Sequence, residues 1–378
     1  MGIVKFNNVK VKGITLCVPD NLINIDDEIE FFNNDLDLLK RNKKILGLNT
    51  RHVVKDKTVF SDLCLSTTNS LFSKLNIDKS TIDTLIVVST SLDFKYPATA
   101  CVLQGILDLP ETCTCFDVSG LSCSGYVHGL YLAHSLISSG ASKRCLILCG
   151  DLTSLHSDRR NRNSNMLFGD AASATVLDYE ENNNQAYFLT GTRGKDFDKL
   201  IAPAGGYAIP IQKDIIDLEL SDDKGNIWHM WDDIMKGFDV FKFSAEVGPK
   251  GIQDILDEAK YTIDDIDYFA IHQANKQIIK TVAGFAKLPQ TKYSFEAFGE
   301  FGNCGAAAII TDMCKKLPTI KHDKVCLASF GVGLSWGFSL LNLKDTFIDQ
   351  VEYYVENENN KSRNEKIKYW TDFYLDKK

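Results

Sequence analysis

The stretch Phe116-Asp117-Val118-Ser119-Gly120-Leu121-Ser122-Cys123-Ser124-Gly125-Tyr126 decides the fold of this chain. Its first residues are apolar and β-favouring, which is typical of the end of a buried strand. From Tyr126 to Ser138 the apolar residues recur at helical spacing, so the sequence predicts a helix there. The turn between the two elements is rich in Ser and Gly, and it places Cys123 where the helix begins.

The position of Cys123 has two chemical consequences. A thiol at a helix N-terminus lies at the positive end of the helix dipole and faces unpaired backbone N–H groups. Both effects favour the thiolate, which is the nucleophilic form of cysteine. The same position also suits a small apolar residue that caps a strand. The segment by itself leaves both interpretations open.

The composition bounds the class of protein. The chain has 378 residues, of which 44% are hydrophobic and 24% charged, as in ordinary soluble globular proteins. A net charge of −8 argues against general affinity for nucleic acid or for an anionic membrane. The N-terminal residues lack the apolar core of a signal peptide, and no apolar run is long enough to span a bilayer. We therefore expect a cytoplasmic protein.

The cysteines predict neither a disulfide framework nor a metal site. There are eleven of them, an odd number, and most lie in apolar segments, so we expect buried reduced thiols. Cys113 and Cys115 form a C-x-C pair, but no His or second Cys pair lies nearby at zinc-site spacing.

Strands alternate with helices along the chain, which indicates an α/β architecture. We expect an N-terminal half over 1–180, which carries Cys123, and a similar C-terminal half over 181–344. The asparagine-rich run 182–184 is the expected hinge between them. Residues 345–378 are charged and aromatic, as in an appended helix or tail.

The second half contains an interruption at 202–237, a segment with few periodic features. A long loop of this kind is more often a lid or substrate cover than irregular surface. After it we expect a helix over 250–260 and a strand over 268–271. A short strand near 293–295 is expected to precede Asn303.

Three polar residues, Cys123, His272 and Asn303, follow expected apolar strands. Functional residues in α/β sheets gather at the carboxyl ends of strands, so these three could converge although they are distant in sequence. A thiolate could take an acyl group, while His and Asn donate hydrogen bonds to the oxygen of an enolate. Taken singly, His272 also suits a capping role and Asn303 a turn.

The segment Gly331-Val332-Gly333 begins like a dinucleotide fingerprint. However, Trp336 occupies the place of the third glycine, and the segment joins two strands instead of opening a helix. We therefore reject a nucleotide site here and expect a backbone N–H donor for an oxyanion.

Taken together, these motifs resemble the β-ketoacyl-acyl carrier protein synthase III family over about residues 1–343. The resemblance implies a thiolase-like α/β fold, in which two similar halves form a five-layered αβαβα sandwich, and a homodimer. The motifs that carry it, in order, are Cys123-Ser124-Gly125, Phe168-Gly169-Asp170, His272-Gln273-Ala274-Asn275, Gly302-Asn303 and Gly333-Leu334-Ser335-Trp336-Gly337.

The resemblance also implies roles for residues. Cys123 would carry the acyl chain as a thioester, while His272 and Asn303 would assist decarboxylation of a malonyl thioester and stabilise its enolate. The backbone N–H groups of Cys123 and Val332 would form an oxyanion hole. The other implied residues are Tyr96 (which crosses the dimer interface), Trp228, Phe330, Gly331 and Gly333 for the substrate pocket, and Asn275 and Lys276 for contact with pantetheine or the carrier.

The implied substrates are an acyl-coenzyme A or acyl-carrier thioester as donor and malonyl-acyl carrier protein as extender, with no tightly bound cofactor. The acyl carrier protein is the implied partner, and no nucleic acid or membrane partner is expected. The tryptophan that often stacks on the coenzyme A adenine is absent near Asp27-Glu28-Ile29, which leaves room for a carrier-bound donor.

Two further departures from the family pattern concern loops. Four residues, Ser119 to Ser122, separate Val118 from Cys123 where the family usually has three, so we expect a reshaped nucleophile loop. Val332 replaces a middle glycine, which keeps the N–H but reduces the freedom of its loop.

The residues leave three functions to weigh. The first is decarboxylative Claisen condensation in fatty-acid or specialised lipid or polyketide synthesis, which His272 and Asn303 favour because both suit an enolate. The second is acyl transfer from Cys123 to a hydroxyl or amine of a sugar or secondary metabolite, with His272 as the base. The third is a non-catalytic scaffold, against which the intact trio argues.

Overall fold

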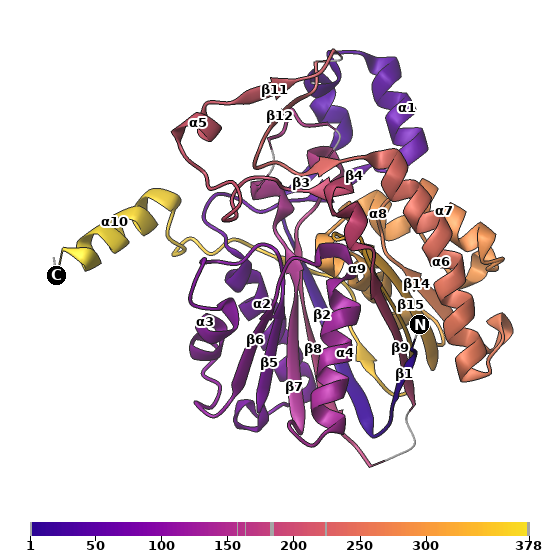
Figure 1. Cartoon of the computed structure of the whole chain (residues 1–378). Helices are drawn as coiled ribbons and strands as arrows, with labels where there is room; N and C mark the ends of the chain where they lie inside the picture. Colours follow the sequence, from indigo (N-terminus) through magenta and orange to yellow (C-terminus); the bar gives the residue numbers. More distant parts are fainter. Residues whose placement is uncertain (1, 157, 163, 182–184, 224, 376–378) are drawn as a thin grey trace.

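The computed structural model describes residues 2–156, 158–162, 164–181, 185–223 and 225–375. Within these residues the strands form a seven-stranded sheet, a five-stranded sheet and three small ladders. The two large sheets stand side by side with helices outside and between them, which gives five layers (Figure 1). The predicted hinge at 182–184 lies outside the described residues.

The seven-stranded sheet has the order β17-β2-β8-β7-β5-β6, with β18 also paired to β2. Pairs β5–β6 and β5–β7 are parallel, while β8 is antiparallel to both β7 and β2. All five residues of β5 are buried, because helices cover both faces of the sheet here. The bounds are β2 Val9–Pro19, β5 Thr84–Val88, β6 Thr114–Val118, β7 Arg144–Asp151, β8 Ala171–Tyr179, β17 Phe347–Ile348 and β18 Glu352–Tyr354.

The five-stranded sheet has the order β1-β9-β16-β15-β14, and only β14 and β15 pair in parallel. Strand β1 comes from the start of the chain, whereas the other four strands of this sheet lie beyond residue 185. The bounds are β1 Val4–Phe6, β9 Ala186–Thr192, β14 Tyr268–Ile271, β15 Lys324–Gly331 and β16 Ser335–Asn342.

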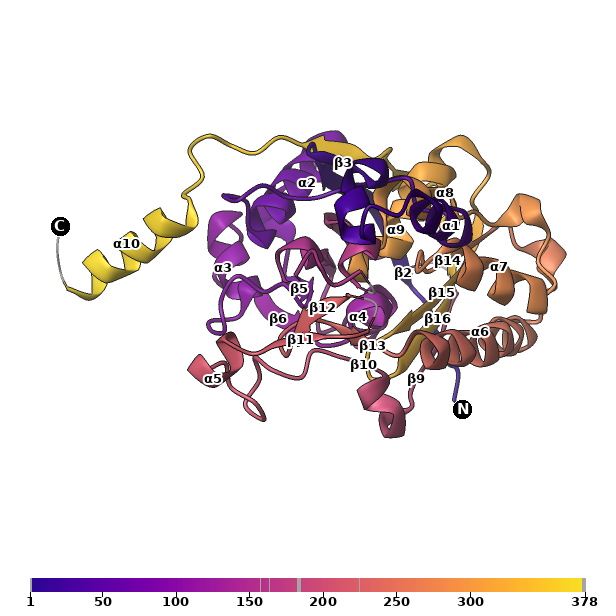
Figure 2. The same ribbon diagram turned by 90° about the horizontal axis from the view of Figure 1, so that it is seen from above.

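Three helical layers enclose the sheets. Helices α2 (Phe60–Leu75) and α3 (Thr99–Ile106) cover the outer face of the larger sheet, and α6 (Gly237–Ala259) with α7 (Lys276–Phe285) covers the outer face of the smaller one. Helices α4 (Gly125–Ser138) and α9 (Ala308–Lys316) contact strands of both sheets (Figure 2). Two further helices, α1 (Leu36–Leu46) and α8 (Glu296–Phe301), lie at the edge that carries the site.

Helix α4 is apolar on more than one side because it lies between the sheets. Tyr126, Val127, Leu130 and Ile137 all belong to one buried core. Gly129 lets the helix approach strand β5, since a Cβ at this position would lie 2.8 Å from a side-chain carbon of Val88. The helix predicted from Tyr126 to Ser138 therefore agrees with α4 to within one residue.

The interruption at 202–237 is folded over the sheet edge and is called the cover segment below. It contains α5 (Lys213–Ile216), and its strands β11 (Glu219–Ser221) and β12 (Ile227–His229) pair with each other. Its last strand, β13 (Ile234–Met235), pairs with β10 (Leu200–Ile201). The third small ladder, formed by β3 (Leu22–Asn24) and β4 (Thr50–His52), lies nearby.

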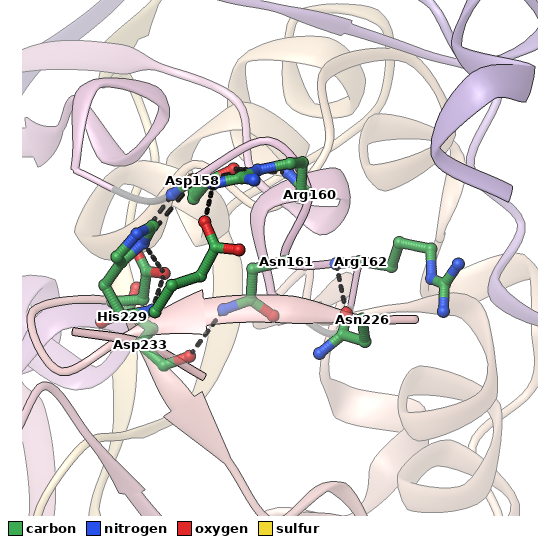
Figure 3. Close-up of polar contacts among 9 residues, drawn as sticks. Asp158, Arg160, Asn161, Arg162, Asn226, His229 and Asp233 are labelled. Atoms are coloured by element: carbon green, nitrogen blue, oxygen red, sulfur yellow. Dashed lines mark hydrogen bonds and ion pairs between the residues drawn. The ribbon is translucent and has the colours of Figure 1, made fainter. Parts of the chain in front are cut away.

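Polar contacts tie the cover segment to residues 158–162 (Figure 3). The Asp158 N–H donates to Asp232 at 2.8 Å, and the Arg160 guanidinium donates to Glu219 at 2.8 Å. The Arg162 N–H donates to the side chain of Asn226 at 2.8 Å. Residues 158–162 thus anchor the cover segment.

Two predicted elements differ from the structure. Residues 293–295 form no strand, because the Ser294 hydroxyl accepts the Glu296 N–H at 3.1 Å and helix α8 begins there. Asn303 consequently follows a helix and not a strand. Helix α6 begins at Gly237 instead of Lys250, since Phe243 is already buried against Trp336 and the helix continues through Pro249.

The segment 345–378, expected as an appended tail, divides into two parts. Strands β17 and β18 run parallel to β2 and extend the seven-stranded sheet. Only α10 (Arg363–Tyr374) stands away from the body (Figure 1). The two strands are two and three residues long, too short to show a period in the sequence.

Candidate active site

Cys123 lies in a single 3-10 turn, Ser122–Ser124, between β6 and α4. The four-residue spacing after Val118 is accommodated by two left-handed residues, Gly120 with φ 80° and Ser122 with φ 41°. The turn buries the cysteine, whose exposed fraction is 6%. The longer loop therefore still presents the thiol directly before the helix.

His272 and Asn303 reach the same place from the other half. His272 directly follows β14, and its backbone N–H donates to the Ala328 carbonyl of β15 at 2.8 Å. Asn303 follows α8 and a left-handed Gly302. With Cys123, both residues line one cavity of about 570 Å³.

The Asn303 amide is oriented toward the thiol. Its Nδ2 lies 3.8 Å from Cys123 Sγ, and its Oδ1 accepts the Gly305 N–H at 3.1 Å. The Asn303 N–H donates to the Leu167 carbonyl at 2.7 Å, which fixes the backbone. Cys123 Sγ also lies 3.9 Å from Oδ1, so the amide can donate to the thiolate or accept from the thiol.

The motif Phe168-Gly169-Asp170 supports the backbone of Asn303. It does not place a further reactive side chain beside Cys123. The Gly169 N–H donates to the Asn303 carbonyl at 3.2 Å, and a Cβ on Gly169 would lie 2.0 Å from the Phe301 carbonyl oxygen. Asp170 accepts the N–H groups of Val54 and Ser154 at 2.8 and 3.0 Å. Burial raises the pKa of Asp170 to about 6.

Burial makes the resting thiol and imidazole neutral. It raises the pKa of Cys123 to about 12, although hydrogen bonds to Ser122 and Asn303 favour the thiolate. It lowers the pKa of His272 to about 3, and the Nδ1 atom has no hydrogen-bond partner among the described residues. A rise from 9.0 to about 12 corresponds to about 4 kcal/mol, whereas a helix end contributes at most about 2 kcal/mol. Desolvation therefore outweighs the helix dipole, and the thiolate expected from the helix start is not the resting form.

This charge state predicts the pH dependence of Cys123 alkylation. With a pKa of about 12, the thiolate is a small fraction throughout the neutral range, and it increases with pH. Labelling by iodoacetamide, followed peptide by peptide, should therefore rise about tenfold per pH unit from about pH 6 to about pH 9. A plateau reached below about pH 8 would contradict it and indicate a thiolate–imidazolium pair. The same Cys123 peptide, labelled in protein unfolded with urea, provides the reference.

The other predicted site residues divide into two groups. Asn275, Phe330, Gly331 and Val332 line the cavity, whereas Gly333 follows the lining residues without contributing to the wall. The remaining three lie elsewhere, namely Tyr96, which is 78% exposed, Trp228 in β12, and Lys276 at the start of α7.

Trp228 lies outside the cavity, because a different part of the cover segment reaches the cavity wall. Residue Trp228 pairs with Leu220 of β11, away from the thiol. Pairing of β13 with β10 instead places Asp233 and Met235 in the cavity wall. Lys276 lies in a separate shallow depression with Ile45, Gln277, Lys280 and Thr281.

Several cavity residues had no signal in the sequence. His156 and Asp233 both line the cavity, and His156 opposes the burial that raises the pKa of the Asp233 carboxyl. Burial also raises the pKa of Asp93, another lining residue. They lie in loops without periodicity. Most of the other lining residues are apolar, including Phe60, Leu92, Leu155, Phe243 and Leu334.

A buried ion pair occupies the region around Asp27-Glu28-Ile29, where no tryptophan is present. Glu28 is 2% exposed, and its carboxylate accepts from Arg51 at 2.5 and 2.7 Å. Arg159 donates to the same carboxylate at 3.0 Å. Hydrogen bonds from two guanidinium groups offset the cost of burying this carboxylate.

Two negative findings apply to the part of the chain that the structure describes. No group of three or more His, Cys, Asp or Glu side chains is arranged to hold a metal ion. Nor does any helix combine the length and the apolar character needed to cross a membrane.

Comparison with known proteins gives a consistent result. Residues 116–194 match the family model of 3-oxoacyl-[acyl-carrier-protein] synthase III, and residues 256–343 match the model of its C-terminal part. A putative 3-oxoacyl-[acyl-carrier-protein] synthase 3 of Campylobacter jejuni is 38% identical over 353 residues, which are 93% of this chain and 99% of the relative. A β-ketoacyl-[acyl-carrier-protein] synthase III of Acholeplasma laidlawii is 31% identical over 89% of this chain and 98% of its own.

Comparison with solved structures leads to the same family. The crystal structure of a 3-oxoacyl-(acyl-carrier protein) synthase from Burkholderia xenovorans has a TM-score of 0.84 and 31% identity, and the match covers 93% of this chain and 99% of that one. The predicted thiolase-like fold is thereby confirmed. Because these relatives match the sequence over almost its whole length, the chain belongs to the 3-oxoacyl-[acyl-carrier-protein] synthase III family.

Proposed function

We propose that this protein catalyses a decarboxylative Claisen condensation, with Cys123 as the acyl-carrying nucleophile. The observation that supports it best is the Asn303 amide, held 3.8 Å from Cys123 Sγ in a cavity that His272 also lines. A thiol, an imidazole and an amide donor are the groups that acyl transfer and enolate stabilisation need.

The first half-reaction loads the acyl group. The Cys123 thiol loses its proton, a new C–S bond forms to the acyl carbon, and the donor thiol leaves with a proton. The proton that Cys123 loses passes to the sulfur of the departing donor thiol, so the loading step does not require His272 as a base.

The second half-reaction forms the carbon–carbon bond. A malonyl thioester loses carbon dioxide, and the electron pair left behind attacks the acyl carbon and expels the Cys123 thiolate. The buried cavity disfavours the malonyl carboxylate. Neutral N–H donors of His272 and Asn303 stabilise the enolate oxygen that develops.

The oxyanion hole proposed from the N–H groups of Cys123 and Val332 has support in how their loops are joined. The Ser124 and Ser335 hydroxyls lie 2.7 Å apart, and Ser335 donates to the Val332 carbonyl at 2.6 Å. Gly331 permits this contact, since a Cβ would lie 2.3 Å from the Leu121 carbonyl oxygen.

For substrates we propose malonyl-acyl carrier protein as extender and a carrier-bound acyl donor in preference to acyl-coenzyme A, with no tightly bound cofactor. The relatives are named for the acyl carrier protein. The Glu28 ion pair stands where a tryptophan could stack on adenine, which favours the carrier. Asn275 lines the cavity and Lys276 lies beyond it, a suitable order for pantetheine and carrier contacts.

We also propose a homodimer joined along β6. This strand ends the seven-stranded sheet, and no other strand of the described chain pairs with its outer side. Apolar side chains are exposed beside it, with Phe116 37%, Ile106 46% and Tyr96 78% accessible. An unpaired strand edge with apolar neighbours favours pairing with a second copy, and Tyr96 could then reach the partner's pocket.

The test is intact-protein mass spectrometry with a panel of acyl-carrier and acyl-coenzyme A thioesters, followed by a chase with malonyl-acyl carrier protein. We expect one acyl adduct on Cys123 that is discharged with release of carbon dioxide. An adduct that ignores malonyl thioester but transfers to an amine or alcohol would replace condensation with acyl transfer. Absence of an adduct from every donor would refute the proposal.

A further inference from the structure

Helix α10 is an exposed helix that carries several aromatic residues. All twelve of its residues are outside the core. At helical spacing the apolar residues Ile367, Tyr369, Trp370, Phe373 and Tyr374 fall on one side, which they share with Arg363 and Lys366, and Asn364, Lys368, Thr371 and Asp372 lie opposite. The last apolar residues are the most open, with Phe373 65% and Tyr374 86% exposed.

The helix needs a packing surface, and within the described residues this chain contacts it at Lys366 and Trp370. Isolated helices shorter than about 12–15 residues are marginal in water. A capping box of Ser362 and Glu365 defines the start. Lys366 donates to the Lys57 carbonyl at 3.1 Å, and the rings of Trp370 and Phe94 meet edge-on at 6.0 Å.

The helix projects over the space that a second copy would fill. In both views α10 extends beyond α3 and β6, on the open side of the seven-stranded sheet (Figures 1 and 2). A copy that continues the sheet across β6 would place its own α3 next to this one. The aromatic side of α10 would then have a protein surface at hand.

Charge also favours a second copy over a membrane. Residues 361–378 hold six basic and three acidic residues, a formal charge of +3, in a chain whose net charge is −8. The rest of the chain is therefore acidic, which attracts this segment but repels an anionic bilayer.

We propose that α10 packs its aromatic side on a second copy of this chain and so strengthens the dimer. The inference rests on the dimer of the proposed function and adds to it a contact outside the two family matches, which end at residue 343. The occupant is the α3 side of the partner, next to the shared strand edge.

The experiment places the photo-crosslinker p-benzoylphenylalanine at Phe373 in the full chain, with Thr371 on the polar side as matched control. Copies with ¹⁴N and ¹⁵N are mixed, so that peptide masses separate crosslinks between copies from those within one. We expect mixed-isotope crosslinks from position 373 to the α3 side, and at least about fivefold fewer from position 371. Crosslinks confined to one copy, or equal yields, would overturn the proposal.

Sedimentation of the same samples distinguishes the proposed role of α10 from the proposed dimer. A dimer without crosslinks between copies overturns only the role of α10, whereas a monomer at all concentrations overturns the proposed dimer as well. The triple variant W370S/F373S/Y374S should raise the dimer Kd about tenfold or more, while K368A/D372A should leave it within about twofold. Equal Kd values for all three proteins, or sedimentation of wild type with phosphatidylglycerol vesicles that the triple variant loses, would count against a partner copy.

Discussion

Replacement of Cys123 by alanine is expected to remove the acyl-enzyme and to lower condensation by at least about 10⁴-fold. The thiol is the one group in the proposed mechanism that forms a bond to the substrate. Nothing beside it can substitute, because its neighbour Asn303 offers an amide and Ser122 a hydroxyl 3.7 Å from the sulfur without an assigned base. The measurement is the mass of the intact protein after exposure to the acyl donor, together with product formation.

The matched control is Cys101→Ala. Cys101 is exposed on α3, outside the cavity lining, so this variant should keep both the adduct and turnover. A thermal melt of C123A checks that loss of activity is not loss of fold. One acyl mass on purified C123A would show that the nucleophile has been assigned to the wrong cysteine.

The second large effect is expected from His272→Ala. We expect Cys123 to acylate still, while the malonyl-dependent step falls about 10²–10³-fold, the usual cost of one lost donor to a developing oxyanion. Burial lowers the pKa of His272 to about 3, so the neutral ring acts as a hydrogen-bond donor. Single-turnover rates of loading and of malonyl discharge, measured separately, test this division.

A conservative variant, His272→Gln, sharpens the test. The glutamine amide keeps an N–H donor of similar reach, so this variant should recover part of the lost condensation rate. The condensation step should also stay independent of pH across the neutral range. If loading of Cys123 fails in both variants instead, His272 is the base for the thiol and its place in the mechanism changes.

The amino-acid sequence by itself determined the strand–turn–helix around Cys123 and the alternation of strands and helices. These features are local: a buried strand is a run of apolar and β-branched residues, and a helix beside a core repeats its apolar residues every three or four positions. Helix α4 lies within one residue of its expected bounds for this reason, and strand β14 matches the expected 268–271. The motifs that supply the site residues can also be recognised in the sequence.

The tertiary structure determined which residues come into contact in the site. Asn303 lies beside Cys123 although it follows α8 and not a strand, because a turn held by Leu167 and Gly169 carries it there. Asp233 enters the cavity and Trp228 does not, because β13 pairs with β10. Such contacts join segments far apart in the chain, and no local period encodes them.

The charge state of the site was decided in the same way. From the sequence, Cys123 at a helix start favoured the thiolate, since a helix dipole can be inferred from local residues. Its pKa instead rises to about 12 because distant segments bury the sulfur. The sequence determined which chemical groups the site contains, and the fold determined their ionisation, because removal of water depends on everything that packs around them.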